Sequence, residues 1–540
     1  MKNNYLLALL SAFLLWLAWP PIPYTGPLLL IAFVPLLLAI ENVIRSSEVK
    51  KGRKIAALAF ITGFLWNTAS IYWVYNAMSA GLPAYAALPI SLIPFGLAPL
   101  LMTIVFGLYY RLRKKQSPAR SLIGLTAFWI CYEYLHQWWD LAFPWMTLGN
   151  GFAATHPLIQ WYEWTGVYGG SVWIWAVNIL VFLLVLHKRN IQSLTKPKWT
   201  NIALIAVLFI PIGGSLIRYF TYEEHLNPSQ VVVVQPNIDP YQKFGSISPE
   251  EQLNTLIRLS ESVAKPNTEF FVWPETAISA RGWIDEDNFR QYPAYAEISS
   301  FLDKYKNGSV LSGIESYRMY TDQRTATARP YGNQFVDNFN AAVFIDNSSK
   351  LQFYHKSKLV PGVEQMPFGS ALSFLKPLFA QFGGTTGGYG KQDEPSVFYA
   401  GSGIGAAPVI CYESIWGDYV GQYVKQGAQF ITIVTNDGWW KNTSGKDQHL
   451  DYAKLRAIEN RRWIARAANT GISAFINQRG DIVQQTSWWV PAALTQEINL
   501  NENITFYTGN GDILVILALL LSLAGIVLLV VPEKKASLKI

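Results

Sequence analysis

The sequence predicts a membrane protein made of two parts: a bundle of about eight transmembrane helices and an α/β domain outside the membrane. Three observations support this fold class. Of the 540 residues, 51% are hydrophobic, and the mean hydropathy is positive. The apolar residues crowd into residues 1–220 and into one run near the C-terminus. The segment between these regions alternates short β-branched runs with amphipathic stretches, as α/β domains do.

Eight apolar runs are long enough, or nearly so, to cross a bilayer. The first follows a lysine, as in a signal peptide, but no small-residue cleavage site follows it and a second span comes at once. We therefore expect it to be retained as a helix. The predicted spans are 5–20, 27–44, 55–76, 88–110, 121–139, 159–187, 202–220 and 512–532.

The positions of the cations predict the orientation, because Lys and Arg near helix ends stay cytoplasmic. They cluster in every second loop, whereas the loops around 21–26, 77–87 and 140–158 carry almost none. We therefore expect both termini inside and residues 221–511 outside the cytoplasm. The net charge of +7 lies mostly in these loops, so nucleic-acid binding is not expected.

Three domains follow from this reading. They are a seven-helix membrane region over 1–220, the external α/β domain over 221–511, and a last helix with a short cytoplasmic tail over 512–540. In the external domain we expect helices over 249–264 and 446–468. Buried strands are expected at 231–238, 270–275, 309–314, 341–346, 407–413 and 430–437.

One of the two cysteines stands where an α/β sheet exposes chemistry. Cys131 lies in the fifth predicted membrane helix and Cys411 in the external domain, so no disulfide between them is expected. Cys411 stands at the end of a buried apolar run, at a turn. A buried cysteine that acts only as a small hydrophobe is the alternative, but this position favours a nucleophile.

A thiol nucleophile needs a base to remove its proton and a cation or amide donors to bind the oxyanion. Glu275 in "VWPE" follows a buried strand, and Lys356 in "YHKSKLVP" stands among aromatic and apolar residues. Each alone is weak evidence, because a charged residue at a strand end usually belongs to a solvated loop. Together with Cys411, in this order, they form a specific combination.

These segments resemble the nitrilase superfamily. The similarity lies in "FVWPETA", "YHKSKLVPGVE" and "VICYES", followed by "TNDGWW" (435–440) and "RAIENRRWIARAANTGIS" (456–473). With membrane helices before and behind, and with "FPWMTLGN" (143–150) and "VQPNI" (234–238), the chain more closely resembles the bacterial apolipoprotein N-acyltransferases over nearly its whole length.

The resemblance implies an αββα sandwich in a multi-pass protein of the bacterial cytoplasmic (inner) membrane, with the catalytic domain on the periplasmic side. It implies that an acyl chain passes from a phospholipid, typically phosphatidylethanolamine, to the α-amino group of the diacylglyceryl cysteine that begins an apolipoprotein. A cysteine thioester carries the chain, and no metal or other cofactor is needed. The partners are then a phospholipid donor and an apolipoprotein acceptor, and we expect a monomer.

By motif match, the resemblance makes Glu275 the general base, Cys411 the nucleophile and Lys356 the cation that stabilises the oxyanion. Glu364 in "PGVEQMP" matches a supporting position of the family, and Glu413 matches the position two residues after the nucleophile.

The chain departs from the family pattern next to Lys356. Where "HLVPFGE" is expected it reads "KLVPGVE", so Lys358 replaces a histidine and Gly-Val replaces Phe-Gly. Lys358 is a rival cation, because alternation along a strand would put both lysines on one face. Motif register alone favours Lys356, which is expected to bind the oxyanion together with the backbone N–H of Tyr412.

An unusually apolar stretch over 366–384 is either a lid that dips into the lipid or a core helix of the domain. Three tryptophans either line the mouth of the cavity or anchor the domain at the membrane interface. The predicted substrate and lid residues are Phe374, Phe379, Phe382, Trp416, Trp439 and Trp440.

Two other function classes are open to this sequence. A membrane-tethered amidohydrolase with the same three residues would use water as acceptor and would release ammonia from simple amides. A transporter or receptor with a non-catalytic external domain would tolerate replacement of Glu275, Lys356 and Cys411 together.

Overall fold

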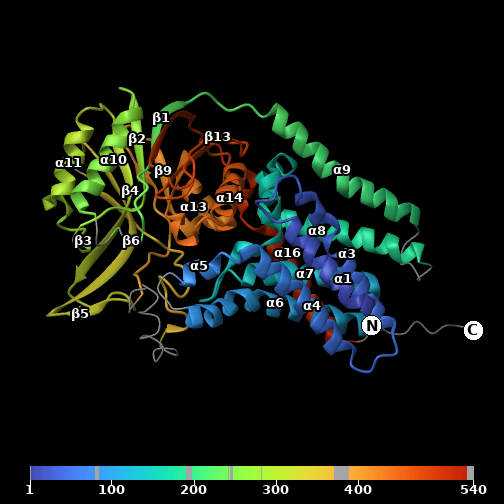
Figure 1. Ribbon diagram of the computed structural model, residues 1–540. Coiled ribbons are helices and arrows are strands. Elements are labelled where there is room, and N and C mark those ends of the chain that lie inside the picture. Colours follow the sequence, from blue (N-terminus) through green and yellow to red (C-terminus); the bar gives the residue numbers. More distant parts are fainter. Residues whose placement is uncertain are drawn as a thin grey trace, which may run out of the picture. The chain divides into compact units, whose positions relative to one another are not determined.

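The structure is a computed structural model that divides into two compact units (Figure 1). The membrane unit comprises residues 1–74, 88–220 and 512–540, and the α/β unit comprises residues 75–87 and 221–511. The residues described are 2–79, 84–189, 197–240, 243, 247–280, 282–348, 350–369 and 388–531.

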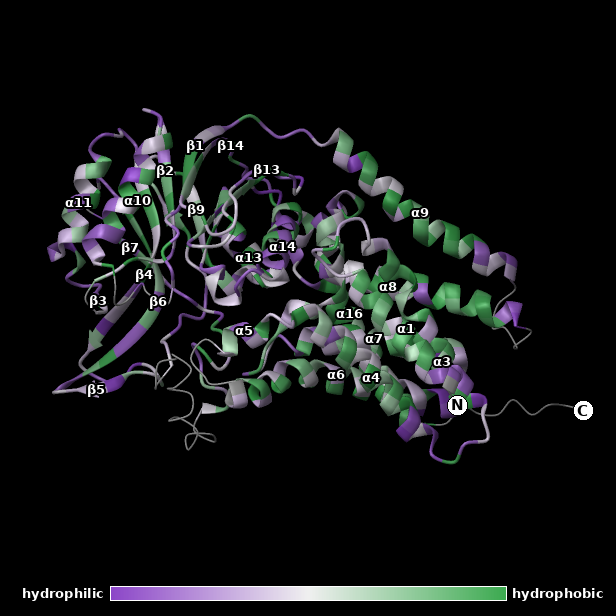
Figure 2. Ribbon diagram, in the orientation of Figure 1, coloured by the Kyte–Doolittle hydropathy of each residue, from purple (hydrophilic) through white to green (hydrophobic). Residues whose placement is uncertain are grey.

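Helices make up the membrane unit, and Figure 2 shows most of them as predominantly hydrophobic. Within the described ranges, six segments are long and apolar enough to span a membrane: 26–45, 51–71, 87–115, 162–188, 197–221 and 513–530. A helix also covers most of each of the two remaining predicted spans, 5–20 and 121–139, so the count of eight stays a prediction. The long helices are α1 (Lys2–Leu17), α3 (Val34–Arg45), α4 (Lys51–Ile71), α6 (Ala84–Lys115), α7 (Pro118–Leu135), α8 (Tyr162–Lys188), α9 (Pro197–Thr221) and α16 (Ile513–Val530).

Helix α6 contains three prolines, and a neighbouring helix compensates for one of them. Pro99 has no N–H to donate to the carbonyl of Phe95 four residues earlier. The side-chain amide of Asn67 in α4 donates to that carbonyl at 3.0 Å and to the carbonyl of Pro94 at 2.9 Å. The backbone group freed by proline is therefore satisfied inside the helix bundle, as an apolar environment requires.

Buried carboxylates of the membrane unit serve as structural links. Glu133 accepts hydrogen bonds from the indole N–H of Trp129 and the backbone N–H of Leu148, both at 2.8 Å. Glu163 of α8 pairs with Arg218 of α9 at 2.8 Å. These partners tie the helices to each other and to the loop "FPWMTLGN", which is almost fully buried.

The α/β unit is built on two sheets. The first has the strand order β14-β1-β2-β4-β6-β5, with β3 beside β4 and β7 beside β6, and the second has the order β13-β12-β11-β10-β9-β8. The neighbours β1, β2 and β4 are parallel, as are β9, β10 and β11. The strand bounds are β1 Pro228–Gln235, β2 Thr268–Ile278, β3 Ile284–Asp285, β4 Ser309–Tyr320, β5 Arg329–Tyr331, β6 Gln334–Asp346, β7 Gln352–His355, β8 Phe398–Tyr399, β9 Gly405–Ile410, β10 Phe430–Thr435, β11 Ile464–Ala468, β12 Ala474–Ile476, β13 Ile482–Gln485 and β14 Ala492–Asn499.

The two sheets pack face to face with helices outside, which confirms the predicted αββα sandwich. Phe270 of β2 meets Phe430 of β10 between the sheets, with ring centroids 4.9 Å apart. Helices α10 (Pro249–Val263) and α11 (Pro293–Leu302) bury their apolar faces on the first sheet. Helices α13 (Gly417–Lys425) and α14 (Ser444–Asn460) pack on the second.

The elements that the sequence predicts are mostly present. Each of the six predicted strands overlaps an observed strand, and the expected helix over 249–264 is α10. The hydroxyl of Ser248 caps that helix by accepting from the N–H of Glu251 at 3.1 Å. The predicted helix over 446–468 is wrong at its end: α14 stops at Asn460, Arg461 adopts a left-handed conformation (φ 49°), and residues 464–468 form β11.

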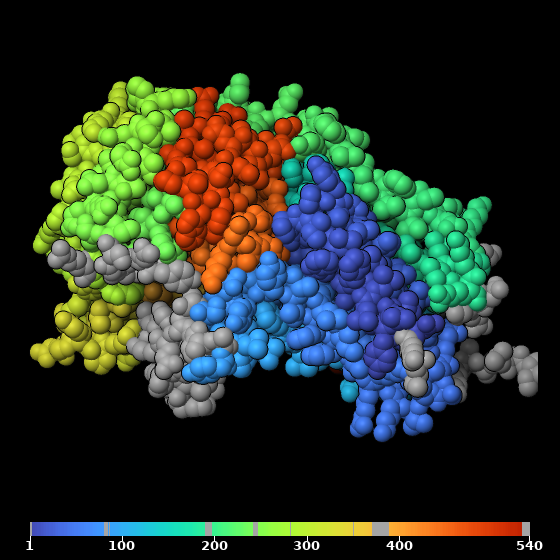
Figure 3. Space-filling view, in the orientation of Figure 1, coloured from blue at the N-terminus to red at the C-terminus, as the bar shows by residue number. Residues whose placement is uncertain are grey.

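The first and last strands of the α/β unit are neighbours. Strand β1 pairs antiparallel with β14 over its full length, from Pro228 opposite Asn499 to Gln235 opposite Ala492. In the space-filling view the red end of the unit accordingly lies against its green beginning (Figure 3). The chain therefore leaves the unit beside the point where it enters.

Candidate active site

Cys411 is the first residue of the short helix η6 (Cys411–Ile415), at the sharp turn that directly follows strand β9. The strand is fully buried, and Cys411 has a φ of +50°, in the left-handed region that residues with a side chain rarely adopt. Its neighbour β10 ends at Thr435, and Asp437 follows. The carboxyl ends of these parallel strands thus bring the thiol next to Asp437, whose charge acts on it.

Glu275 lies on β2 of the other sheet, at a break in the strand pairing. Its ladder with β4 is interrupted between Trp273 and Ile278, and Thr276 has a φ of +52°. Gly313 of β4 makes room for this distortion: a Cβ there would lie 2.5 Å from the Cα of Glu275 and 2.4 Å from the nitrogen of Thr276. The carboxylate of Glu275 is buried, at 7% exposure.

We expect Gly313→Ala to destabilise the unit and to displace Glu275, because the added methyl group meets backbone that cannot rotate away. Overpacking of this kind costs about 1–3 kcal/mol. Denaturant unfolding of the purified protein measures the loss, and Gly401→Ala is the matched control, since its Cβ would meet nothing closer than 3.9 Å. Equal stability of the two variants would contradict this reading of the strand break.

Lys356 connects two carboxylates inside the unit. Its ammonium lies 3.2 Å from Oε1 of Glu275 and 2.9 Å from Oε1 of Glu364, and the side chain is 1% exposed. The amide of Asn340 donates to the same two oxygens, at 2.8 and 2.7 Å. Lys356 is held in turn by its backbone N–H, which donates to the carbonyl of Asn340 at 2.9 Å.

Lys358 takes a different direction from Lys356. Strand β7 ends at His355, so the alternation that would put both lysines on one face does not extend to them. The ammonium of Lys358 lies over the ring of Tyr419, 4.9 Å from its centroid. Geometry thus separates the two lysines that the sequence left as rivals, and it is Lys356 that meets Glu275.

The unusual "PGVE" loop still delivers Glu364 to the site. Gly362 supplies a φ of +81°, and the turn is closed by the N–H of Glu364, which donates to the carbonyl of Val360 at 2.9 Å. Oε2 of Glu364 accepts from the N–H of Val360 at 2.8 Å, which leaves Oε1 for Lys356. The sequence departure therefore moves the glycine of the turn without moving the carboxylate out of reach.

Glu413 joins the lysine loop to the cysteine turn. One oxygen accepts from the N–H of Ile410 at 2.9 Å. The other accepts from the N–H of Ser357 and the hydroxyl of Tyr354, both at 2.6 Å. Because Glu413 is fully buried and holds both segments, it fixes the position of Lys356 relative to Cys411.

The electrostatics leave the thiol protonated and the lysine charged. Burial raises the pKa of Cys411, the charge of Glu275 raises it further, and Lys356 lowers it by less. Burial also lowers the pKa of Lys356, but Glu364 and Glu275 outweigh it and hold that pKa well above its usual value. The nearby cation therefore does not outweigh burial, and a nucleophilic role for this thiol would require a base to remove its proton.

Sequence reasoning missed a second buried lysine behind Glu275. Lys243 is 3% exposed, donates to the hydroxyl of Thr276 at 2.6 Å, and also binds the carbonyl of Thr276. Burial lowers its pKa to about 8. The lysine anchors the distorted part of β2, and only its place after "VQPNI" could have marked it in the sequence.

A buried ionic cluster behind Cys411 was also missed. Arg466 of β11 donates to Asp437 at 2.7 Å, and His449 of α14 lies 3.0 Å from the same carboxylate. All three side chains are at most 1% exposed. Although burial raises the pKa of Asp437, Arg466 and His449 bring it well below its usual value.

The predicted substrate residues fall into two groups. Trp416 is buried against Tyr412, with ring centroids 4.8 Å apart, and the ring of Trp440 lies 5.4 Å from that of His449. Trp439 is 37% exposed. All three tryptophans thus follow the ends of β9 and β10. Phe374, Phe379 and Phe382, with most of the stretch 366–384, lie outside the described residues.

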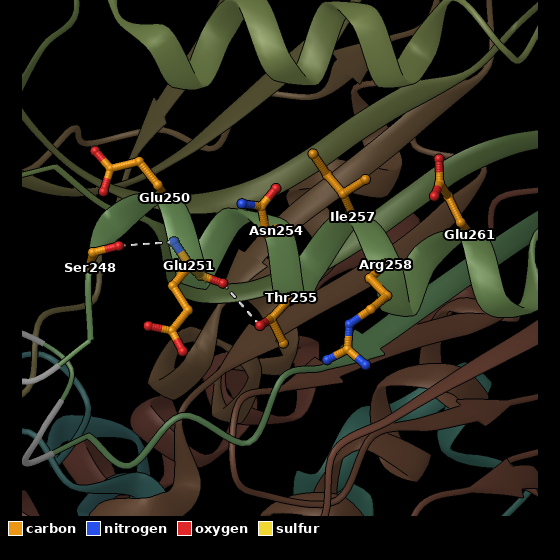
Figure 4. Close-up of a pocket in the computed structure, with 8 residues that line it drawn as sticks. All are labelled: Ser248, Glu250, Glu251, Asn254, Thr255, Ile257, Arg258 and Glu261. Carbon is orange, nitrogen blue, oxygen red and sulfur yellow. Dashed lines mark hydrogen bonds between the residues drawn. The ribbon is translucent and has the colours of Figure 1, made fainter.

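A surface depression elsewhere in the α/β unit does not involve this chemistry. It runs along the outer side of α10 and is lined by Glu250, Glu251, Arg258 and other polar residues of that helix (Figure 4). None of the predicted site residues lines it, so it is separate from the group around Cys411.

Comparison with known proteins identifies the family to which the chain belongs. Residues 11–180 match the family described as the apolipoprotein N-acyltransferase N-terminal domain, and residues 230–505 match the carbon-nitrogen hydrolase family. An apolipoprotein N-acyltransferase of Chlorobaculum tepidum is 30% identical over 550 residues, which cover 99% of this chain and 98% of the relative. The chain belongs to the apolipoprotein N-acyltransferase family.

Another member of the apolipoprotein N-acyltransferase family, from Geobacter metallireducens, is 29% identical over 525 residues, which cover 95% of this chain and 92% of the relative. A nitrilase-superfamily structure from Saccharomyces cerevisiae aligns with 52% of this chain and 93% of its own at 15% identity, with a TM-score of 0.36. The chain is thus a multi-pass membrane acyltransferase with a nitrilase-type domain.

Proposed function

We propose that this acyltransferase moves an acyl chain from a phospholipid of the phosphatidylethanolamine type, through a thioester on Cys411, to the α-amino group of the diacylglyceryl cysteine of an apolipoprotein. The observation that carries the proposal is the buried ammonium of Lys356, bound to Glu275 and Glu364, with charges that act on the Cys411 thiol. The relatives named apolipoprotein N-acyltransferase support the choice of acceptor.

In the first half-reaction Glu275 takes the proton of Cys411, and the thiolate attacks the ester carbonyl of the phospholipid. Lys356 and the backbone N–H of Tyr412 bind the oxyanion, and one such donor is worth about 3–4 kcal/mol. When the intermediate collapses, the C–O bond breaks and the alkoxide takes the proton from Glu275. A lysophospholipid leaves, and a thioester remains on Cys411.

In the second half-reaction the amine of the acceptor attacks the thioester. Glu275, now deprotonated, accepts a proton from the attacking nitrogen. Collapse breaks the C–S bond, the Cys411 thiolate recovers its proton from Glu275, and an amide is released. The acyl group passes from an ester to a thioester and then to an amide, which is the most stable of the three linkages. The two half-reactions therefore need no ATP.

Mass spectrometry of lipoprotein N-termini tests the proposal in cells depleted of this protein. We expect N-terminal cysteines that carry the diacylglyceryl group and lack the amide-linked chain. Fully acylated N-termini after depletion would contradict the proposal. Release of ammonia from simple amides by the purified protein, without acyl transfer, would instead favour the amidohydrolase.

The two lysines are expected to differ in activity as they differ in position. Lys356→Ala should lower the rate of acyl transfer by about 10²–10³-fold, because it removes an oxyanion donor. Lys358→Ala should change that rate by less than about threefold, since its ammonium faces Tyr419. The measurement is the rate of transfer to a diacylglyceryl peptide. An equal loss in both variants would contradict the assignment of Lys356.

We further propose that residues 221–511 face the periplasm, because the cations of the membrane unit cluster in alternate loops. In a variant without native cysteines, Asn307→Cys should react with a membrane-impermeant maleimide added to cells. Lys114→Cys should react only after the membrane is opened. Labelling of both from the same side would contradict this topology.

A further inference from the structure

The carbonyl oxygen of Cys411 is held by two side chains. The hydroxyl of Ser414 donates to it at 2.8 Å, and Nε2 of His449 lies 3.2 Å from it and 2.9 Å from that hydroxyl. A carbonyl oxygen only accepts hydrogen bonds. The Ser414 hydroxyl donates its single hydrogen to this carbonyl and so has none left to donate to His449. Nε2 of His449 therefore carries a hydrogen and donates it to this pair of oxygens.

The cluster described above fixes the imidazole of His449 from its other side. Nδ1 of His449 lies 3.0 Å from a carboxylate oxygen of Asp437 and 3.0 Å from the guanidinium of Arg466. Arg466 is anchored in turn by the carbonyl of Ile472 at 2.6 Å. A ring held by partners on both nitrogens has one orientation, so its donor is directed at the cysteine turn.

The peptide bond between Cys411 and Tyr412 links this contact to the reaction. The bond is trans, so its C=O and its N–H point in opposite directions within one rigid plane. The C=O points at His449 and Ser414, and the N–H of Tyr412 therefore points away from them. That N–H is the backbone donor assigned above to the oxyanion.

We propose that His449 is a positioning residue that sets the oxyanion-binding N–H of Tyr412 by holding and polarising the carbonyl of Cys411. The proposal rests on the proposed function, which makes this N–H an oxyanion donor. Cys411 has a strained, left-handed φ, and a residue keeps such a conformation only when its surroundings fix it. The hydrogen bond from His449 to the carbonyl of Cys411 helps to fix it. A hydrogen bond to the C=O also strengthens the N–H of the same peptide as a donor.

Two reactions of Cys411 distinguish a positioning role of His449 from a general role in folding. Acyl transfer passes through an oxyanion, whereas alkylation by iodoacetamide displaces iodide from a saturated carbon and forms none. We expect His449→Leu to slow thioester formation by about 30–300-fold, near the 10²–10³ that removal of an oxyanion donor costs. Alkylation of Cys411 should stay within about threefold of the native rate. His449→Gln, whose amide can donate from a similar place, should recover at least about a tenth of the native transfer rate.

A spectroscopic measurement gives a second readout. With a ¹³C-labelled acyl chain, the thioester carbonyl stretch of the loaded enzyme should move to higher frequency in His449→Leu, because its oxygen receives a weaker hydrogen bond. If His449→Leu does not fold, Ser414→Ala removes the other donor to the same carbonyl and should shift the stretch in the same direction, with a loss of about tenfold in transfer.

The results that overturn the proposal are distinct from failure of the proposed function. An unchanged transfer rate and stretch in the variants, or an equal loss of alkylation and transfer, would show that His449 does not set the oxyanion donor. Failure of the native protein to form any thioester on Cys411 from phospholipid would instead refute the proposed function, and it is measured before any variant.

Discussion

Cys411→Ser is expected to lose the thioester and to reduce acyl transfer by about 10³-fold or more. A hydroxyl is a much poorer nucleophile than a thiol unless its base is tuned to it. In the proposed mechanism Glu275 is the base for a thiol, and burial already raises the pKa of that thiol. Given phospholipid and no acceptor, the native protein should accumulate a hydroxylamine-labile acyl group, and a diacylglyceryl peptide should discharge it.

The matched control is Cys131→Ser, which removes the only other cysteine of the chain. That variant should load and discharge its acyl group at the native rate. Peptide mass spectrometry locates the label. Transfer that persists without Cys411, or an acyl group found on Cys131, would refute the thioester mechanism even though the family assignment would stand.

Glu275→Gln is expected to abolish loading of the acyl chain, with a loss of about 10²–10⁴-fold, the usual contribution of a general base. The amide oxygen can still accept from Asn340 and Lys356, so the site keeps its shape while losing the proton acceptor. Glu269→Gln is the control on the same strand, because Glu269 binds Ser229 and takes no part in the group around Cys411.

The loading rate of Glu275→Gln should also depend on pH, and the direction of this dependence can be predicted. Without a base, the reactive species is the thiolate already present, and the pKa of Cys411 is raised by burial. The thiolate fraction then grows about tenfold for each unit of pH below that pKa. Loading in the variant should therefore rise continuously through the alkaline range, and a flat profile would show that another group takes the proton.

The three proposed catalytic residues could be found in the sequence because each follows or interrupts a strand that is apolar enough to be recognised. Cys411 follows β9 directly, and Lys356 follows β7 directly. Glu275 was expected just past its strand but lies inside β2, at the break that Gly313 accommodates. Contiguous hydrophobic runs in the sequence thus predict where a strand lies and which residues are near its end. They do not predict a break in the pairing within a strand, such as the one at Glu275.

The supporting residues could not be found in this way, because their partners are distant in sequence. Asn340 is an ordinary polar residue within β6 until pairing with β4 and β7 brings it to Glu275 and Glu364. His449 and Arg466 were both placed in one predicted helix. The left-handed turn at Arg461 separates them into α14 and β11, and only that separation lets both reach Asp437.

The pairing of β1 with β14 also sets an order of events during synthesis. The chain emerges with β1 first, yet one edge of that strand has no partner until residues 492–499 have been made. Contacts so distant in sequence form slowly, because the entropy of closing a long loop is lost before the contact can stabilise the chain. A nascent chain that already contains Cys411 therefore still has an incomplete first sheet, the sheet that carries Glu275. If Cys411 carries the acyl chain as proposed, we expect competence only after residues 492–499 have been made and have paired with β1, so an arrested chain that lacks β14 should hold a thiol that cannot be loaded.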